Sequence, residues 1–363
     1  MENLTSASSK QTLNLPQTNI VNRSIVLNSR PIGVPTAVNF KLQEDTVPTP
    51  SEGQVLLRAL YLSLDPYMRG RMSDAPSYVP PVALDAVMVG STISIVETSL
   101  NVDFKLGDLV LSSNGWQEYA LSDGKDLVKI NASKLDKTTL KPSLSLGILG
   151  MPGFTAYMAL LDIGEPKPND TVVVTAASGA VGAAVGKIAK IKGCYVIGIA
   201  GGKDKCRYVV NELGFDICID HHAENFAQEL ADACSKGIDV YFESVGGKVF
   251  DAVLPLLNTK ARIPVCGMIA NYNNTSLPHG PDRHGLLESI LLRKRIKMQG
   301  FIIFDDYGSR YPEFVKQMTS WLKQDKVKFL EDIIDGLENA PQAFIGMLKG
   351  KNFGKTIMRV SQY

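Results

Sequence analysis

A buried strand followed by a glycine-rich turn and a helix constrains the fold of this chain more than any other feature. Residues 171–175 are Thr-Val-Val-Val-Thr, a β-branched run typical of a strand that is buried on both faces of a parallel sheet. The turn from Ala176 to Gly182 follows, and Ala, Val and Ile then recur at helical spacing as far as Ile191. This pattern predicts the first strand and helix of a doubly wound α/β unit.

The alternation of strands and helices continues through the second half of the chain. Five further apolar runs follow the first strand, at residues 195–199, 217–220, 238–242, 261–266 and 296–304. Helical patterns separate them, which predicts a parallel, doubly wound sheet. Near the end we expect one helix to close at Trp321 and Leu322, another over 341–348, and a last strand over 355–360. The sequence does not decide which part of the fold this last strand joins.

Residues 24 to about 130 follow a different pattern. Short apolar runs such as 54–58, 91–96 and 108–111 are separated by prolines and glycines. Frequent short strands with turn residues between them predict an irregular β-barrel or sandwich. The predicted fold class is therefore α/β, with a β-rich domain beside a doubly wound, parallel-sheet domain. Residues 1–22 are mostly polar and are expected to form a poorly ordered arm.

Composition excludes several classes of protein. The chain has 363 residues, 45% of them hydrophobic, and its 38 basic and 37 acidic side chains give a net charge of +1. This balance argues against a nucleic-acid-binding protein, which normally carries a large basic excess. No run approaches the roughly 18 apolar residues of a membrane-spanning helix, and the polar N-terminus has no features of a secretory signal. We expect no membrane partner and a cytoplasmic location.

The cysteines and histidines do not form a metal-binding pattern. The five cysteines are Cys194, Cys206, Cys218, Cys234 and Cys266, and no two of them have C-x-x-C spacing. An odd number without paired spacing is typical of free thiols in a reducing compartment. The four histidines make no cluster with them, and the first 150 residues contain neither residue type. We therefore predict that the protein has no metal site.

The glycine-rich turn has the form A-x-G-x-x-G, from Ala177 to Gly182. Gly179 lets the backbone approach a pyrophosphate closely, and Gly182 allows the helix to pack tightly against the strand. The N–H groups at the start of the helix then face the phosphates. A dinucleotide site is the favoured interpretation, and an ordinary tight strand-to-helix connection is the alternative.

The end of the second strand indicates which dinucleotide binds. An NAD site normally has an acidic residue here that holds the ribose diol. This chain has Gly201 and Gly202, which leave room for a 2′-phosphate, followed by Lys203 and Lys205, which can neutralise it. The pattern favours NADP, although Asp204 could instead turn back toward the ribose.

Four stretches, residues 64–69, 150–157, 177–182 and 348–356, carry a family resemblance. In them the chain resembles the zinc-independent medium-chain dehydrogenase/reductases, and within these the prostaglandin reductase and alkenal double-bond reductase group. The similarity runs from about residue 24 to the C-terminus, and residues 213–222 are similar to those of the bacterial NADPH-dependent curcumin reductases. The resemblance implies a GroES-like substrate domain formed by residues 23–150 and 326–363, around an inserted Rossmann domain at 151–325. It further implies homodimers that use NADPH to reduce the C=C bond of α,β-unsaturated ketones and aldehydes.

The resemblance and the fingerprint together assign the cofactor site. The expected cofactor-binding residues are Pro152, Thr155, Gly179, Ala180, Val181, Gly182, Gly202, Lys203, Lys205, His221, Ser244, Cys266, Gly267, Met268, Ile269, Tyr272, Phe301, Ile302, Ile303 and Asn352. Lys205 matches the family lysine that holds the 2′-phosphate. His221 stands where relatives have a tyrosine near the ribose, Ser244 replaces an asparagine, and Val89 replaces a tyrosine of plant members.

Without a metal, the simplest compatible chemistry is hydride addition to an electron-poor carbon. The β-carbon of an enone accepts hydride from nicotinamide C4, and negative charge moves to the carbonyl oxygen as an enolate. A neutral phenol can donate a hydrogen bond to that oxygen, so Tyr67 and Tyr272 are the candidate catalytic residues, with Tyr67 the first choice. The alternatives are that the Tyr67 ring simply packs, that Tyr272 only shapes its turn, and that a ribose hydroxyl or a water supplies the proton.

Two other functions stay open from the sequence. The first is a quinone oxidoreductase of the same superfamily, which would pass electrons to a quinone instead of a C=C bond. The second is a non-catalytic NADPH-binding protein that uses its first domain as an interaction surface. A long substrate such as curcumin and a short alkenal are not separated by the sequence.

Overall fold

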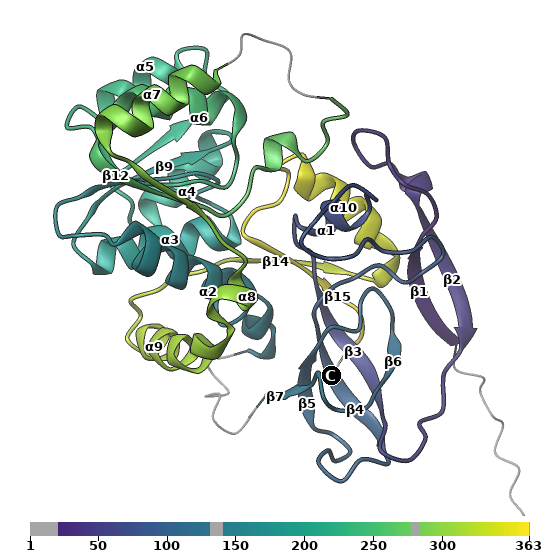
Figure 1. Cartoon of the computed structure of the whole chain (residues 1–363). Coiled ribbons are helices and arrows are strands. Elements are labelled where there is room, and N and C mark those ends of the chain that lie inside the picture. The colour runs from purple at the N-terminus through teal and green to yellow at the C-terminus, as the bar shows by residue number, and fades with distance from the viewer. Residues whose placement is uncertain (1–20, 131–140, 277–282, 363) are drawn as a thin grey trace, which may run out of the picture.

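The computed structural model describes residues 21–130, 141–276 and 283–362, which fold into two domains that lie side by side (Figure 1). The predicted arm, residues 1–22, falls almost entirely outside the described residues. Its last two residues, Val21 and Asn22, already belong to the first strand, β1 (Val21–Leu27).

A six-stranded parallel sheet organises one domain. Its strand order is β10 (Ile217–Asp220), β9 (Tyr195–Ala200), β8 (Thr171–Val174), β11 (Ile238–Phe242), β12 (Leu257–Val265) and β13 (Lys297–Gly300). Every neighbouring pair in this sheet is parallel. The order reverses between β8 and β11, the point at which doubly wound sheets bind their ligands. The predicted fold class of this domain, a Rossmann sheet, is confirmed.

Helices cover both faces of the parallel sheet (Figure 1). Val172 and Val174 of β8 face a core that includes α2 (Met151–Met158), α3 (Ala180–Ile191), α4 (Lys203–Asn211) and α9 (Tyr311–Lys323). Val173 points to the opposite core, against α5 (Phe226–Ala233), α6 (Gly247–Val253) and α7 (His284–Lys294). Burial on both faces explains why the strand has no polar alternation in the sequence.

One predicted strand is partly wrong. The apolar run 296–304 forms a strand only over β13, and the chain then turns into the short helix α8 (Ile303–Tyr307). The carboxylate of Asp306 accepts a hydrogen bond from the backbone N–H of Ile302 at 2.8 Å, which caps the start of α8. The apolar residues from Phe301 to Phe304 do not reveal whether a strand or a helix follows Gly300, because they are apolar in either conformation.

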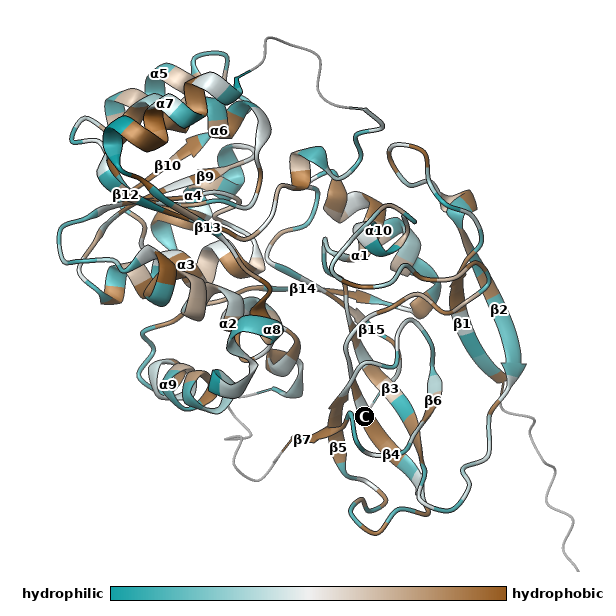
Figure 2. Ribbon diagram, in the orientation of Figure 1, coloured by the Kyte–Doolittle hydropathy of each residue, from teal (hydrophilic) through white to brown (hydrophobic). Residues whose placement is uncertain are grey.

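The β-rich domain contains a seven-stranded sheet and a separate hairpin. The sheet order is β14 (Glu331–Asp335), β15 (Lys355–Arg359), β3 (Val55–Ser63), β4 (Thr92–Ser99), β5 (Leu109–Ser112) and β7 (Val128–Lys129), and β6 (Tyr119–Ser122) also pairs with β3. The hairpin joins β1 to β2 (Phe40–Thr46). Figure 2 shows apolar residues along the strands of both domains.

The last part of the chain returns to this first domain, which the residue pattern left undecided and the family resemblance implied. Strand β15 pairs antiparallel with β3. The helix α10 (Ala340–Leu348) sends Phe344 against Trp116, with ring centroids 5.7 Å apart, and Phe40 completes the cluster. Residues from both ends of the chain therefore share one hydrophobic core. The boundaries at residues 22, 150 and 325 stay predictions.

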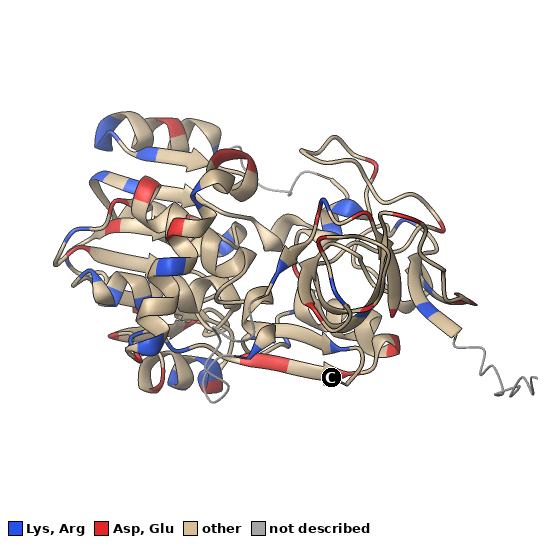
Figure 3. Ribbon diagram, turned by 90° about the horizontal axis from the view of Figure 1, so that it is seen from below, with Lys and Arg blue, Asp and Glu red and all other residues tan. Residues whose placement is uncertain are grey.

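The surface is electrically mixed. Lys and Arg are interspersed with Asp and Glu over both domains (Figure 3), as the net charge of +1 suggests. Across residues 21–130, 141–276 and 283–362, no helix is long and apolar enough to cross a membrane. In the same described residues, no three or more His, Cys, Asp or Glu side chains gather into a group that could hold a metal ion.

Candidate active site

The glycine-rich turn lies at the switch point of the parallel sheet. Strand β8 ends at Val174, and Gly179 is the residue before α3, with an extended backbone. A Cβ on Gly182 would lie 2.4 Å from the backbone oxygen of Ala176, so this position admits only glycine at its present helix–turn spacing. A Cβ on Gly179 would lie 3.1 Å from the same oxygen, a much milder contact. Tight packing by Gly182 is therefore a property of the fold itself, and the first N–H groups of α3 are presented at the sheet edge.

The C-terminal segment of the chain lies against this turn. Gly354 forms a parallel β-bridge with Gly179. The Lys205 ammonium donates a hydrogen bond to the Gly350 oxygen at 2.7 Å, and the Asn352 side-chain amide donates to the Gly354 oxygen at 2.9 Å. The predicted residues Gly179, Lys205 and Asn352 are thus brought together from three distant parts of the sequence.

The two glycines after β9 differ in the space around them: a Cβ on Gly202 would meet nothing within 4 Å, whereas Gly201 is crowded. Gly202 has a φ of +94°, and its backbone N–H donates to the Asp220 carboxylate at 2.8 Å. A Cβ on Gly201 would lie 3.0 Å from the imidazole Nε2 of His221, so this ring occupies the space that a side chain would need. Asp204 is exposed and forms an ion pair with Arg207. Its carboxylate is therefore engaged on the surface of α4.

The basic side chains that follow β9 differ in their environment. Lys203 is exposed, whereas Lys205 is half-buried, and burial lowers the pKa of its ammonium although the Asp332 carboxylate opposes that change. Burial also lowers the pKa of His221, helped by the neighbouring His222 and Lys248, while Asp220 raises it. The imidazole of His221 is therefore neutral at pH 7.

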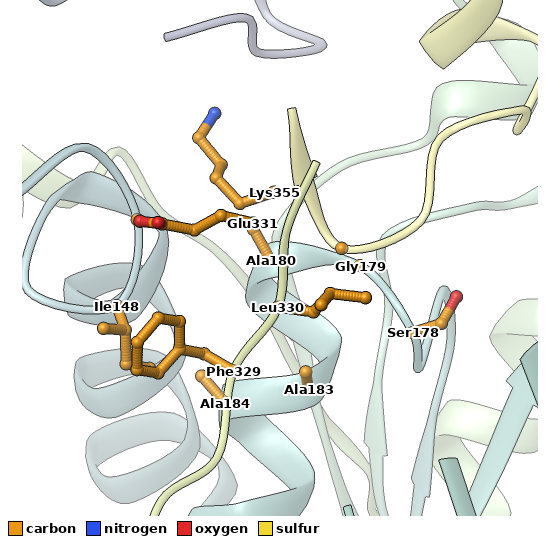
Figure 4. Close-up of a pocket in the computed structure, with 12 residues that line it drawn as sticks. Ile148, Ser178, Gly179, Ala180, Ala183, Ala184, Phe329, Leu330, Glu331 and Lys355 are labelled. Atoms are coloured by element: carbon orange, nitrogen blue, oxygen red, sulfur yellow. The ribbon is translucent and has the colours of Figure 1, made fainter. Parts of the chain in front are cut away.

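A small cavity, lined mainly by apolar atoms, lies where the C-terminal segment crosses α3 (Figure 4). Ala183 and Ala184 of α3 face Phe329 and Leu330 across it. Above the cavity, the buried Lys355 ammonium pairs with the Asp65 carboxylate at 2.7 Å and donates to the Leu64 oxygen at 2.7 Å. This buried ion pair ties the C-terminal strand to the loop that carries Tyr67.

The two predicted catalytic tyrosines lie in one electrostatic cluster formed by both domains. Burial raises the pKa of Tyr67 well above its usual value; Asp65 raises it further, and the nearby Arg71 lowers it. Burial also raises the pKa of Tyr272, and the Cys266 and Tyr78 side chains lie close enough to raise it further. Tyr78 acts on both Tyr67 and Tyr272, so it links the two. All three phenols are protonated at neutral pH and can donate hydrogen bonds.

Sequence reasoning missed Tyr78 and Arg71. Tyr78 is 57% exposed in the loop after α1 (Met68–Arg71). The Arg71 Nε is buried and has no hydrogen-bond partner among the described residues. From the sequence, Arg69 and Arg71 are both interpreted as surface charges, with a salt bridge that ties down its loop as the alternative for Arg69. Arg69 instead is buried and donates to the Asn273 side chain at 2.9 Å and to the Gly33 oxygen at 2.8 Å.

The contact between Arg69 and Asn273 also positions Tyr272, because Asn273 follows Tyr272 directly. Arg69 of the β-rich domain holds the turn of Tyr272, which belongs to the other domain. Together with the Lys355–Asp65 pair, it fixes the two loops that carry the candidate tyrosines.

The loop expected to line the nicotinamide is organised by Glu243, which the sequence analysis also missed. Its buried carboxylate accepts hydrogen bonds from the N–H groups of Val245 at 2.6 Å and Gly246 at 2.9 Å, and from the Tyr241 hydroxyl at 2.9 Å. The Cys266 N–H donates to the Glu243 backbone oxygen at 2.8 Å. These bonds bring the ends of β11 and β12 side by side at the sheet edge.

Ser244 and Cys266 face each other in this loop. The Ser244 Oγ is buried without a hydrogen-bond partner of good geometry among the described residues, and it lies close enough to the Cys266 thiol to lower its pKa. Burial outweighs that effect and raises the pKa of Cys266 to about 12. A Cβ on Gly267 would lie 2.9 Å from the Tyr272 hydroxyl, so Tyr272 closes over the same loop. Met268 and Ile269 follow Gly267 in the same loop.

The remaining predicted residues lie in α2 and in the segment that leads into α8. Pro152 and Thr155 are buried in α2, which packs against α3. Phe301, Ile302 and Ile303 lead into α8, and the Ile303 side chain is buried in the core of the parallel-sheet domain. These positions support the sheet edge, and any contact of Ile303 with a cofactor falls to its backbone.

Comparisons with known proteins agree with this architecture. Residues 23–130 match the family described as the N-terminal domain of oxidoreductase, and residues 180–321 match the family described as zinc-binding dehydrogenase. The NADPH-dependent curcumin reductase of Escherichia coli (strain K12) is 62% identical over 340 residues, which are 94% of this chain and 97% of the relative. The NADP(+)-dependent 2-alkenal reductase of Nicotiana tabacum is 39% identical over 352 residues, 94% of this chain and 98% of the relative.

A solved structure has the same fold throughout. The crystal structure of CurA from Vibrio vulnificus in complex with NADPH matches with a TM-score of 0.90 at 61% sequence identity. The match covers 94% of this chain and 100% of that one.

Proposed function

The chain belongs to the medium-chain dehydrogenase/reductase family, in the group of the prostaglandin and alkenal reductases, and we propose that it reduces the conjugated C=C bond of α,β-unsaturated ketones and aldehydes, curcumin among them. It is an NADPH-dependent oxidoreductase that acts on C=C bonds. One observation carries the proposal: Tyr78 lies close enough to act on both Tyr67 and Tyr272, which belong to different domains, and Arg71 acts on Tyr67 and Tyr78. A site with several neutral donors and one cation suits a carbonyl oxygen that becomes an enolate.

The residues at the sheet edge fit NADPH. The turn at Gly179 would receive the pyrophosphate, because a longer side chain there would occupy the approach to the first N–H groups of α3. Lys203 and Lys205 would hold the 2′-phosphate, with His221 beside the ribose. The unpartnered Ser244 Oγ and the loop from Cys266 to Ile269 would face the nicotinamide end. When bound, NADPH supplies a hydride for the β-carbon of the substrate.

The chain's own contribution is to hold and polarise the substrate carbonyl. The Tyr67 phenol stays protonated across neutral pH because burial raises its pKa, so it can donate a hydrogen bond to the carbonyl oxygen throughout. The Arg71 cation lies close enough to stabilise the negative charge that develops there. Tyr272, at the sheet edge, is placed to orient the substrate, and a water or Tyr272 then protonates the α-carbon.

The first experiment follows oxidation of NADPH by absorbance when curcumin, a simple enone or a quinone is added, with NADH in parallel. We expect NADPH to be consumed selectively with the enones, and mass spectrometry to find products that gain two hydrogens and keep the carbonyl. Consumption of NADPH with quinones alone would favour the quinone oxidoreductase. Binding of NADPH without oxidation by any acceptor would favour the non-catalytic protein.

Cofactor preference gives a direct prediction. Replacing Lys205 with Met removes the half-buried cation nearest the proposed phosphate, so we expect the KM for NADPH to rise about 30-fold, as for the loss of a charge-assisted hydrogen bond. The KM for NADH should change little, because NADH lacks the 2′-phosphate. Steady-state kinetics with both cofactors checks this, with Lys192→Met, an exposed lysine at the end of α3, as the control. A parallel rise in both KM values would contradict the assignment.

The lowered pKa of His221 predicts how the affinity for NADPH depends on pH. The imidazole is neutral at pH 7.5 and gains a proton as the pH falls, which places a cation beside the 2′-phosphate. Between pH 7.5 and 5.5 we expect the affinity of the native protein to improve about fivefold relative to His221→Gln, the size of one screened charge pair. Titration of the phosphate is common to both proteins and cancels in the ratio. The more exposed His222→Gln should behave like the native protein; equal pH profiles for native and His221→Gln would refute the role.

We further propose that the protein is a homodimer that pairs through β13. This strand lies at the edge of the parallel sheet, and all four of its residues are exposed. Met298 is 38% exposed on it and Leu292 of α7 is 79% exposed nearby, an arrangement that natural edge strands usually avoid unless they are paired. Met298→Lys with Leu292→Lys should convert dimers to monomers in light scattering, whereas Leu106→Lys, equally apolar and exposed in the β-rich domain, should not. A native monomer would exclude the proposal.

Two coarser features are proposed with it. A substrate domain of residues 23–150 and 326–363 and a cofactor domain of 151–325 are supported by the pairing of β15 with β3. A cytoplasmic location is supported by the five cysteines, all of which are free thiols.

A further inference from the structure

Cys206 and Cys218 lie close together near Lys203 and Lys205, the lysines proposed to hold the 2′-phosphate. Cys218 in β10 pairs in register with Gly198 of β9, and a Cβ on Gly198 would lie 2.9 Å from Val209 of α4. Residues paired in register on parallel strands point to the same face, so Cys218 also points toward α4. Cys206 lies one helical turn before Val209, on the same face of α4. The two thiols therefore face each other between the helix and the strand, close enough for each to shift the pKa of the other.

The surroundings favour Cys206 as the nucleophile of the pair. Its side chain is partly exposed, and Lys203, Lys205 and Arg207 flank it in the first turns of α4. Interaction with Cys218 lowers the pKa of Cys206, although burial and the Asp220 and Glu229 carboxylates oppose this change. Interaction with Cys206, together with burial, raises the pKa of Cys218. A partly exposed thiol whose pKa is lowered is the reactive type of cysteine.

The other three cysteines differ. Burial raises the pKa of Cys194 to about 11, and that of Cys234 and Cys266 to about 12. None of them interacts with another cysteine among the described residues, which include all five.

We propose that Cys206 and Cys218 are a redox-sensitive pair that hydrogen peroxide converts to a disulfide, and that this disulfide weakens the binding of NADPH. The Cys206 thiolate attacks one peroxide oxygen, the O–O bond breaks, and the second oxygen leaves as water after taking up a proton. The Cys218 sulfur then attacks the Cys206 sulfenic acid, the S–S bond forms, and a second water leaves. The two thiols lose two electrons in total, and one peroxide is reduced to two waters.

The effect on the cofactor follows from the contacts of the first turn of α4. The Cys206 N–H donates to the Gly202 oxygen at 3.2 Å, and the Gly202 N–H donates to Asp220 at the end of β10, so Cys206 and Gly202 share one hydrogen-bonded turn. A disulfide of about 2.05 Å is far shorter than a contact between two thiols, so it draws this turn toward β10. Lys205 precedes Cys206 directly and moves with it. This step rests on the proposed position of the 2′-phosphate at Lys203 and Lys205.

The test uses the full-length protein, treated with hydrogen peroxide and then freed of it. We expect the intact mass to fall by two hydrogens and proteolysis to yield one cross-linked peptide that joins Cys206 to Cys218. The Kd for NADPH, measured by cofactor fluorescence, should rise about 10-fold, as for the loss of a charge-assisted hydrogen bond. Dithiothreitol should restore both values, and NADPH bound beforehand should slow the oxidation.

Variants separate the pair from general oxidation. Cys206→Ser and Cys218→Ser should abolish the cross-link and the change in Kd, while Cys234→Ser should keep both. Cys206→Ala and Cys218→Ala serve as second choices if either serine variant unfolds. Absence of the cross-linked peptide, or an equal loss of affinity in Cys218→Ser, would overturn the inference. Neither readout needs an enone, so a protein that fails to reduce enones would refute the proposed substrate and leave the redox result standing.

Discussion

Replacing Gly182 with Ala is expected to lower the free energy of unfolding by about 2 kcal/mol or more, because the added Cβ overpacks a rigid contact. That Cβ would lie 2.4 Å from the backbone oxygen of Ala176 and 2.9 Å from its carbonyl carbon. Backbone atoms cannot rotate away as the end of a side chain can, so α3 must move relative to β8. Denaturant unfolding measures the loss, and fluorescence titration should find a parallel loss of NADPH affinity.

Gly179→Ala is the matched control for this prediction. Its Cβ would lie 3.1 Å from the same Ala176 oxygen, and its φ is negative, so we expect a small change in stability. Its affinity for NADPH should nevertheless fall, because the methyl group lies where the pyrophosphate is expected to approach the backbone. If Gly179→Ala lost stability and Gly182→Ala did not, the division of roles between the two glycines would be wrong.

Replacing Tyr67 with Phe is expected to lower kcat for enone reduction about 100-fold, the effect of removing one donor to a developing oxyanion. The ring and its packing remain, so the KM for NADPH should stay within about twofold of the native value. Because burial keeps the Tyr67 phenol protonated, the loss should be the same at pH 7 and pH 8. Steady-state kinetics at both pH values, with product analysis by mass, provides the measurement.

Tyr272→Phe and Tyr195→Phe complete this experiment. Tyr272→Phe tests the second candidate, and the double variant should lose turnover while it keeps its affinity for NADPH. Tyr195 is 39% exposed at the start of β9, so its variant should have the native kcat. A Tyr67→Phe enzyme with at least half the native kcat would assign the enolate to Arg71, Tyr78 or a water instead.

Much of the parallel-sheet domain could be predicted because its signals are local. Each strand from β8 to β11 is a short, mostly apolar run, whereas β12 begins at Leu257, four residues before the predicted run 261–266. The spacing of Gly179 and Gly182 depends on one strand, one turn and one helix. The run 296–304 was the exception: the strand ends at Gly300, and the apolar residues from Phe301 to Phe304 do not show whether strand or helix follows. The expected cofactor residues at the turn, at Lys205 and at Asn352 could be named because family motifs mark positions on local elements, but their meeting depends on the tertiary structure.

The sequence by itself determined the order of elements and the type of the nucleotide turn, because backbone sterics and hydrophobic periodicity act over a few residues. Only the tertiary structure decided that β15 joins β3, that Arg69 holds the turn of Tyr272, and that Arg71 and Tyr78 lie with the two candidate tyrosines. The same holds for Cys206 and Cys218, which are twelve positions apart and look unrelated in sequence. These pairings depend on burial and packing between distant segments, and no local pattern of residues encodes which segments will meet.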